Sequence, residues 1–373
     1  MSTIQSNSKI GIGILGVGNI AELCSKGYLQ DDRCKVVAVC DVNEDKAKRK
    51  AEKWGIKQVY TDIDEFLNDS SIDAVEILTP THMHKNHVAA AASAKKHISC
   101  QKPIATSIPD SIDMIQAARE VDVTFRINEC FYHFPPLVEA RNLIQQGKIG
   151  IPQQIRIHTL VGQTDSDFQV GMDPDGYGWR FSDASPGGHI FDDMVHKIAI
   201  SQWLVGQKIV SLKSSVRRQH TFFEPFVSLL EYEDGNLLGI LDSVYGHNLW
   251  MNSSYYGADE FVEITGDEGF IWVTRCTGEL LDFPPLSIFE GDKDKRAFKH
   301  IDTINADWGA GFELSSKHFL DSLIDESILP EMTPDDATNV LQICFGIYQA
   351  AVTGNSVDPR TIDNFVISPG GYP

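Results

Sequence analysis

The sequence predicts an α/β protein with two domains: a doubly wound parallel sheet, then an α+β domain built on a large, mostly antiparallel open sheet. Two patterns lead to this prediction. Up to about residue 128, short apolar runs of strand length alternate with helical segments. From residue 153 onward, short β-like runs follow one another, with turn signals between them. We therefore expect one domain at residues 1–128 and a second at residues 129–373.

The composition is typical of a soluble globular protein, with 42% hydrophobic and 23% charged residues in 373. The net charge of −20 argues against binding to nucleic acid or to a membrane surface, because both need clustered Lys and Arg. No apolar run has transmembrane length, and Met1–Ser8 lacks the pattern of a signal peptide. The seven scattered cysteines indicate reduced core residues, so we expect a cytoplasmic protein.

The first strand is predicted at residues 10–14, where isoleucines alternate with glycines. It leads into Gly16–Ala21, a G-x-G-x-x-A turn. Gly16 permits a tight turn, Gly18 lets a pyrophosphate approach the backbone, and Ala21 lets the next helix pack on the strand. The N–H groups at the start of that helix would face the phosphates. The turn therefore predicts a dinucleotide site; in the alternative interpretation the glycines serve only packing in an ordinary βαβ unit.

The second strand, Val36–Cys40, ends in Asp41, at the expected spacing of about 20 residues after the glycine turn. An aspartate at this place accepts hydrogen bonds from an adenosine ribose diol and repels a 2′-phosphate. Val42 and Asn43 follow it, where an arginine would favour the phosphate. We therefore expect NAD as the cofactor rather than NADP.

The remaining elements of the first domain follow the same alternation. Helices are predicted at 43–54, 62–67, 84–96 and 107–121, and strands at 74–78, 98–100 and 123–127. Ligands of doubly wound sheets bind at the carboxyl ends of the strands. Three chemically rich stretches fall on that edge, namely Gly16–Ala21, Thr79–His84 and Gln101–Pro103.

The pattern changes after residue 128, where Phe134-Pro135-Pro136 interrupts the chain. A helix is predicted at 137–146, and two more at 311–325 and 334–353 close the second domain. Strands are predicted between them, at 155–161, 209–217, 226–232, 237–245, 260–264 and 269–273.

The segment 186–204 begins with a glycine pair and continues with apolar residues at helical spacing. On one helix, Asp192 and His196 would share a face, and a carboxylate beside an imidazole suits a general base. Two further pairs have the same spacing, His189 with Asp193 and Asp193 with Lys197. The alternative is that all of these are surface ion pairs without a catalytic role.

Lys102 follows a predicted strand end and precedes a proline. At the ligand-binding edge its ammonium would lie near a nicotinamide and could stabilise a substrate alkoxide. The alternative is an ordinary surface lysine.

A metal site is not expected. His82, His84 and His87 lie close together in the sequence, but zinc needs three or four convergent ligands, and nothing nearby completes a set.

Taken together, these motifs resemble the Gfo/Idh/MocA oxidoreductase family, which includes glucose-fructose oxidoreductase and inositol dehydrogenase. The matching stretches run through nearly the whole chain: Gly16–Ala21, Thr79–His84, Gln101–Pro103, Gly187-Gly188 with Asp192 and His196, Thr333–Ala337 and Ala350–Gly354.

The resemblance implies an N-terminal Rossmann domain and a C-terminal domain whose open sheet often forms a subunit interface. It also implies a catalytic set of three residues: Lys102 touching substrate and nicotinamide ribose, Asp192 as orienting partner, and His196 as acid/base. The cofactor-binding residues would be Gly16, Gly18, Asn19, Ile20, Asp41, Thr79, Pro80, His84, Gln101 and Lys102.

The chain departs from the family pattern around these motifs. Gln101 replaces the usual Glu, Met194 stands where many members have Gly, and Asp193 and Lys197 add charges where apolar residues are common. The segment 128–136 lacks the arginine that many relatives carry just before the proline. Trp179 and Arg180, which precede the glycine pair in the sequence, are expected to contact the substrate in place of that arginine.

The expected function is therefore hydride transfer between NAD(P) and a secondary alcohol or ketone of a small-molecule sugar, glycoside or cyclitol. Two alternatives remain open: a non-redox enzyme that cleaves glycosides with retained NAD, and a regulatory protein that senses NAD or a sugar. An exposed sheet face would favour a homo-oligomer, either a dimer or a tetramer.

Overall fold

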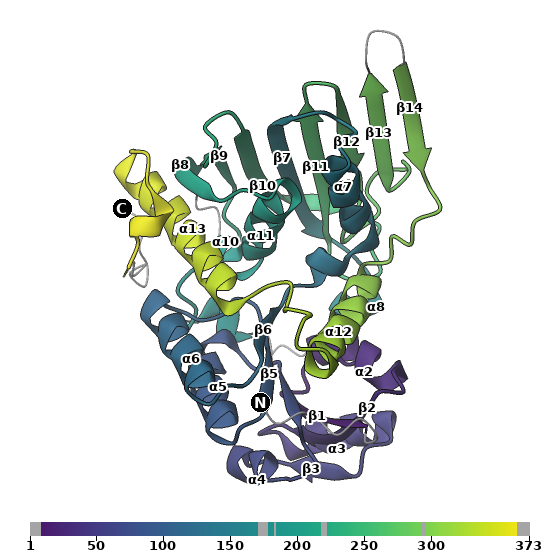
Figure 1. The fold of residues 1–373 in the computed structure, drawn as a ribbon, viewed down its shortest axis with the longest axis vertical. Coiled ribbons are helices and arrows are strands. Elements are labelled where there is room, and N and C mark those ends of the chain that lie inside the picture. The colour runs from purple at the N-terminus through teal and green to yellow at the C-terminus, as the bar shows by residue number, and fades with distance from the viewer. Residues whose placement is uncertain (1–8, 171–177, 183, 218–221, 292–295, 364–373) are drawn as a thin grey trace. The chain divides into compact units, whose positions relative to one another are not determined.

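The computed structural model describes residues 9–363 except 171–177, 183, 218–221 and 292–295 (Figure 1). The N-terminal segment Met1–Ser8, for which no signal peptide is predicted, lies outside the described residues. The chain forms two compact units: Met1–Cys130 with Phe312–Thr338, and Phe131–Gly311 with Asn339–Pro373. Among the described residues, no helix is both long and apolar enough to cross a membrane.

The first unit contains the predicted parallel sheet, with strand order β3-β2-β1-β4-β5-β6. Its strands are β1 (Ile10–Leu15), β2 (Cys34–Cys40), β3 (Gln58–Tyr60), β4 (Ala74–Ile77), β5 (His97–Gln101) and β6 (Phe125–Asn128). Its helices are α1 (Ile20–Cys24), α2 (Lys26–Gln30), α3 (Glu44–Trp54), α4 (Ile63–Leu67), α5 (His84–Ser93) and α6 (Ile108–Glu120). The doubly wound fold is confirmed, and β3 is a strand that the sequence did not predict.

Local sequence signals explain the helix bounds in this unit. The side chain of Asn43 accepts a hydrogen bond from the Lys46 N–H at 3.0 Å, which caps α3. Gly55 ends the same helix in the left-handed region at φ 68°. Ser107 caps α6 in the same way as Asn43 caps α3, through the Asp110 N–H. The strands β1 and β4 are buried at every residue, as central strands of a covered parallel sheet are.

The first unit also includes a segment from far along the chain, 312–338, so its bounds differ from the single boundary predicted at residue 128. Arg126 on β6 donates from Nη1 to the carbonyl oxygen of Ser315 at 2.6 Å, and from Nε to Ser99 Oγ at 2.9 Å. Ser316 Oγ donates to the Cys24 carbonyl oxygen at 2.7 Å. These long-range bonds connect groups that no local pattern relates. The assignment of 1–128 to cofactor binding and of 129–373 to substrate binding and oligomerisation stays a prediction.

The second unit contains an eight-stranded sheet in the order β14-β13-β12-β11-β7-β10-β9-β8. Only β7 and β10 pair in parallel among these strands, so the expected mostly antiparallel sheet is confirmed. The sequence did not predict β13 and β14. The strands are β7 (Pro152–Gln163), β8 (Ile209–Val216), β9 (Phe226–Tyr232), β10 (Leu238–Trp250), β11 (Ala258–Gly266), β12 (Gly269–Val273), β13 (Leu286–Gly291) and β14 (Arg296–Ile301).

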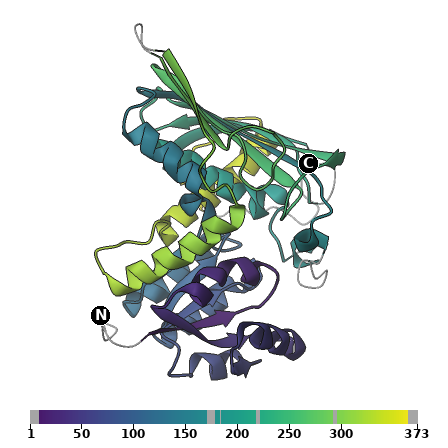
Figure 2. The ribbon, with the colours of Figure 1, turned by 90° about the vertical axis from the view of Figure 1, so that its right-hand side faces the viewer.

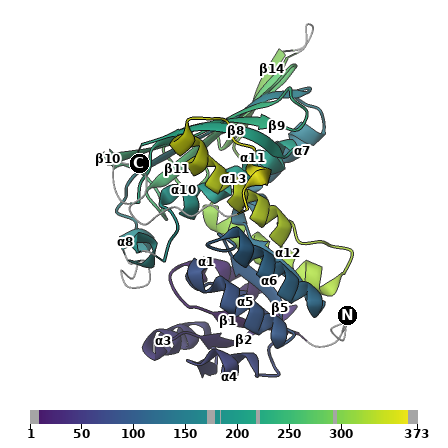
Figure 3. The same cartoon turned by 90° about the vertical axis from the view of Figure 1, so that its left-hand side faces the viewer.

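Helices cover one face of this sheet, with α11 against β7 and β10 and α7 against β12 (Figures 2 and 3). The helices are α7 (Pro135–Gln145), α8 (Asp167–Val170), α10 (His189–Asp192) and α11 (Met194–Val205). Two later helices, α12 (Trp308–Ile324) and α13 (Pro334–Thr353), each have residues in both units. Met194–Leu204 is buried at every residue, which identifies α11 as a core helix.

We expect Arg126→Met to lower the free energy of unfolding by about 3–5 kcal/mol, because it leaves the carboxylate of Glu76 buried without its nearest cation, 3.9 Å away. The matched control is Arg119→Met. Arg119 also pairs with the segment 312–338, through Asp335, but its side chain is 68% exposed and the pair should contribute under about 1 kcal/mol. Urea unfolding of both variants measures the difference. Equal losses would show that burial of the charge is not what matters.

Candidate functional site

The glycine turn of the first unit has the backbone that the sequence predicts. Gly16 adopts φ +88°, and a Cβ there would lie 3.0 Å from the Leu78 and Thr79 backbone. A Cβ on Gly18 would meet nothing within 4 Å, so the space in front of this residue is open. The turn therefore needs glycine at Gly16, and that the open space at Gly18 admits a pyrophosphate stays a prediction. This open cradle fits a pyrophosphate, although the helix behind it, α1, has only five residues and adds a small dipole.

Asp41 is held against the same turn. Its Oδ2 accepts a hydrogen bond from the Val17 N–H at 3.0 Å, and its Oδ1 accepts one from the Asn43 N–H at 2.9 Å. The carboxylate is half-buried, and its place beside the glycine turn is the one that a ribose-binding acid occupies.

His84, predicted to line the cofactor, is completely buried. Its Nε2 lies 2.9 Å from the Thr79 carbonyl oxygen, and its Nδ1 lies 3.0 Å from that of Pro103 and 3.1 Å from that of Ile104. Burial lowers the pKa of His84, although the three carbonyl groups act in the opposite direction. In this unit, His84 connects the segment after β4 to the segment after β5.

Gln101 and Lys102 form the end of β5. The Lys102 N–H donates to Gln101 Oε1 at 2.8 Å, and Gln101 Nε2 donates to Cys24 Sγ at 3.4 Å. The Lys102–Pro103 peptide is cis. The buried Gln101 side chain thus fixes the backbone from which the half-buried Lys102 side chain extends.

His82, His84 and His87, the histidines considered as metal ligands from the sequence, each have a different environment. His84 faces backbone carbonyl groups, His87 Nδ1 lies 2.9 Å from Thr79 Oγ1, and His82 is exposed. The absence of a metal from the function stays a prediction.

The glycine pair of the second unit is required by close packing. A Cβ on Gly187 would lie 2.7 Å from the Tyr348 hydroxyl, and one on Gly188 would lie 2.3 Å from the Phe222 carbonyl oxygen. Tyr348 in turn donates from its hydroxyl to Glu224 Oε2 at 2.7 Å. The turn that precedes the candidate acid/base is therefore held by residues distant in the sequence.

The expectation of one continuous helix after this turn is wrong. Asp193, with φ −113°, separates α10 from α11, so Asp192 ends the first helix and His196 lies in the second. That Asp192 orients His196 across this break stays a prediction. The polar Asp193 makes ion pairs at this break, with Lys197 Nζ at 2.8 Å and with His189 Nε2 at 3.4 Å.

Arg180 lies beside Asp192, and Trp179 lies beside Arg180; that these two residues contact a substrate stays a prediction. Arg180 Nε donates to Asp192 Oδ1 at 2.8 Å, and the guanidinium lies 4.6 Å from the centre of the Trp179 ring. Asp192 and His196 are both buried, and the His196 ring lies 4.9 Å from that of Phe131. The sequence did not predict that Asp192 pairs with an arginine.

The sequence also missed Glu260, which lies 2.7 Å from Lys197 Nζ through its Oε1. Lys197 and Glu260 are each at most 1% exposed. One signal could have found this acid, since Asp259 and Glu260 are consecutive charges at the start of a strand that continues with Phe261 and Val262.

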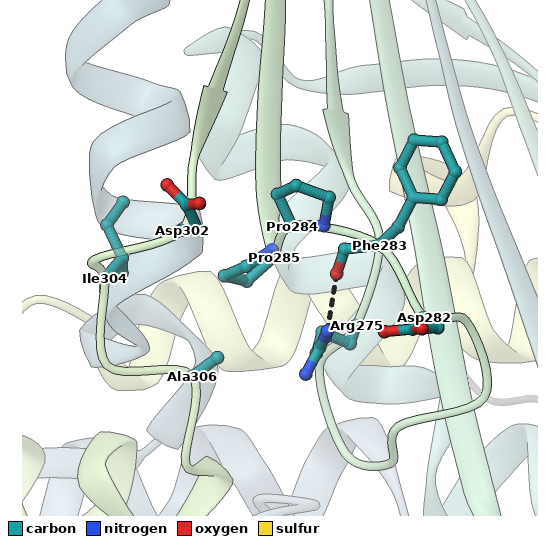
Figure 4. Close-up of a pocket in the computed structure, with 8 residues that line it drawn as sticks. All are labelled: Arg275, Asp282, Phe283, Pro284, Pro285, Asp302, Ile304 and Ala306. Carbon is teal, nitrogen blue, oxygen red and sulfur yellow. Dashed lines mark hydrogen bonds between the residues drawn. The ribbon is translucent and has the colours of Figure 1, made fainter.

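A separate surface pocket of about 350 Å³ lies in the second unit (Figure 4). Within it, Arg275 Nη2 donates to the Phe283 carbonyl oxygen at 2.5 Å. Its lining residues are Arg275, Asp282, Phe283, Pro284, Pro285, Asp302, Ile304 and Ala306. None of the predicted site residues lines this pocket.

Within each unit, then, the predicted residues gather as follows. In the first unit, Gly16, Asp41, Thr79 and Lys102 lie at the carboxyl ends of the parallel strands. In the second, Trp179, Arg180, Asp192 and His196 surround the break between α10 and α11. That Lys102, Asp192 and His196 act together stays a prediction.

Comparisons with known proteins agree with this geometry. The model of an oxidoreductase family with an NAD-binding Rossmann fold, GFO/IDH/MocA, matches residues 10–129. The model of the GFO/IDH/MocA C-terminal domain matches residues 137–272.

Three relatives illustrate the similarity. Myo-inositol 2-dehydrogenase of Thermotoga maritima is 27% identical over 295 residues, 76% of this chain and 80% of that protein. The 2,7-anhydro-N-acetylneuraminate hydratase of Escherichia coli is 28% identical over 303 residues, 77% of this chain and 76% of that protein. A structure of scyllo-inositol dehydrogenase from Lactobacillus casei with NAD(H) and scyllo-inositol has a TM-score of 0.74 at 18% identity, covering 95% of this chain and 100% of that one. This chain belongs to the GFO/IDH/MocA family of oxidoreductases.

Proposed function

We propose that the chain is an NAD-dependent dehydrogenase that acts on a secondary alcohol of a sugar, glycoside or cyclitol. The observation that carries the proposal is the edge of the first sheet, where the glycine turn, the Asp41 carboxylate and the Lys102 backbone lie at the carboxyl ends of parallel strands of one sheet. The names of the relatives, which include inositol dehydrogenases, support the substrate class.

In this proposal, residues of the first unit bind the cofactor, and residues of both units act on the substrate. The open cradle at Gly18 would hold the pyrophosphate, and Asp41 would accept hydrogen bonds from the adenosine ribose. When bound, NAD supplies the hydride acceptor. His196 would take the proton from the reacting hydroxyl, and Lys102 would stabilise the developing alkoxide. Asp192 would orient His196 while it holds Arg180, and Trp179 would provide an apolar wall for the sugar ring.

A non-redox enzyme with retained NAD is the second candidate. It is favoured by the similarity to a 2,7-anhydro-N-acetylneuraminate hydratase, whose name describes a reaction without net oxidation. In that reaction, the substrate would be oxidised transiently and would regain its hydride within the same turnover, with retained NAD supplying the hydride acceptor. The protein would then convert a substrate without accumulating NADH.

The test is a screen of sugars, glycosides and inositols with NAD, followed at 340 nm and by product analysis. Net NADH formation with a polyol or a free sugar would support the dehydrogenase. Cleavage or hydration without net NADH would support the second candidate. His196→Ala should lower kcat by about 100-fold or more, because it removes the acid/base, while NAD affinity changes little. Equal losses of turnover and NAD affinity would remove His196 from this role.

NAD should be preferred over NADP, because the Asp41 carboxylate would repel a 2′-phosphate. Asp41→Asn removes the charge and should raise kcat/KM for NADP relative to NAD by about tenfold. The exposed Asp64→Asn on α4 is the control, and it should leave the ratio unchanged. A wild-type enzyme that favours NADP would contradict the assignment.

We also infer that copies of the chain assemble through the outer face of the eight-stranded sheet. On β9 the residues alternate between buried and exposed, and Leu229 is 55% exposed; Phe298 on β14 is 43% exposed and packs near Phe270 and Trp272. Apolar patches of this kind mark interfaces.

Sedimentation velocity of the full chain should show a dimer or tetramer. Leu229→Glu combined with Phe298→Glu should dissociate it, because each change places a charge on the apolar face. Ile112→Glu changes an equally exposed residue on α6 of the first unit and should leave the assembly intact. A monomeric wild type would refute this inference.

A further inference from the structure

A cluster of three charged side chains, Asp193, Lys197 and Glu260, lies at the break between α10 and α11. Lys197 Nζ lies 2.8 Å from Asp193 Oδ2 and 2.7 Å from Glu260 Oε1, and the side chain is only 1% exposed. Glu260 lies on β11, and its Oε2 accepts a hydrogen bond from the Thr277 N–H at 3.1 Å. One ammonium thus connects the residue before α11 to a strand of the sheet that α11 covers.

The ammonium is charged in the folded protein. Burial alone would lower the pKa of Lys197, but the two adjacent carboxylates hold it above its ordinary value. The pKa of Asp193 is shifted in the opposite direction, downward. Although burial opposes this, Lys197, His189 and His196 hold the pKa of Asp193 well below its usual range. A buried charge needs such partners, since its desolvation costs several kcal/mol.

The cluster is connected to His196 in two ways. Lys197 is the next residue on α11, and its Nζ lies 5.0 Å from the centre of the Phe131 ring. The His196 ring lies 4.9 Å from the same ring. Phe131 therefore contacts both the ammonium and the imidazole, and a displacement of Lys197 would be transmitted to the histidine side chain.

We propose that Lys197 is a positioning residue of the candidate site: it fixes the first turn of α11 on β11 and supplies the one positive charge between Asp193 and Glu260 beside His196. This inference rests on the proposed function only for its effect on turnover. The effect of the Lys197 charge on the imidazole of His196 does not depend on which reaction the protein catalyses.

Other charged groups near His196 must be counted. Asp192 is paired with Arg180, and His189 with Asp193. Two buried residues directly before Phe131 in the chain, Glu129 and Cys130, are also titratable. Next to Glu260, burial raises the pKa of Asp259 to about 6, and the Glu260 charge adds to this effect. Asp193, Lys197 and Glu260 together carry one net negative charge.

The test is a charge cycle in the full chain. Lys197→Met leaves two unbalanced carboxylates, so the imidazolium form of His196 should be favoured and its pKa should rise by about one pH unit or more. Glu260→Gln removes one negative charge and should lower the pKa of His196. The double variant Lys197→Met with Glu260→Gln restores the net charge of the wild type and should return the pKa to near its original value. Lys197→Arg keeps the positive charge, so of these variants it should change the pKa of His196 least.

Two readouts separate this inference from the proposed function. NMR titration of ¹⁵N-labelled histidine, with the His196 signal assigned by its loss in His196→Ala, reports the ring without any substrate. The pH profile of kcat/KM reports it during turnover. A matching pattern in both supports the positioning role and the proposed reaction. The NMR pattern without dehydrogenase activity supports the positioning role and rejects the reaction.

A merely structural role of Lys197 predicts a different result. All variants would then lose thermal stability and turnover, while the His196 titration stayed at its wild-type position. That result would overturn the inference. If Lys197→Met alone does not fold, the downward shift in Glu260→Gln and the recovery in the double variant still decide the question.

Discussion

Buried charges in this protein are matched by partners from distant parts of the chain, and much of the packing in each unit depends on this matching. In the first unit, Arg126 is 2% exposed and Glu76 is completely buried. Tyr28 and Asn128 donate to the two carboxylate oxygens of Glu76, while Arg126 bonds to Ser315. Burial raises the pKa of Glu76, although these partners counteract the effect. The network brings a late segment of the chain against strands formed at its beginning.

The edge of the first sheet brings together segments that are separated in the sequence. In the order β3-β2-β1-β4-β5-β6, the carboxyl ends of neighbouring parallel strands meet, which places the segments after β1, β4 and β5 side by side. His84 and Gln101 use their polar atoms to hold backbone and neighbouring side chains there. Gln101 in this way holds the backbone of Lys102, whose proposed role on a ligand depends on that position.

In the second unit, several charged side chains meet at one place, the break at Asp193. Asp193 and Lys197 take part there in a buried ion-pair cluster with Glu260. Arg180 pairs with Asp192 one residue earlier. Because charges in a low-dielectric interior act on one another strongly, this cluster contributes to the electrostatic surroundings of His196, the next residue to Lys197 in the chain.

The sequence by itself determined the parallel first sheet, the glycine turn, the acid after the second strand and the largely antiparallel second sheet. These features depend on neighbouring residues, through backbone sterics at Gly16 and the alternation of side chains along strands. Strand β14 was missed because most of its side chains are exposed and its pattern carries little apolar periodicity. Tertiary structure alone decided that residues 312–338 join the first unit, that a helix breaks at Asp193, and that Lys197 meets Glu260. Each of these depends on which buried polar groups find partners, and that is settled only when distant segments pack together.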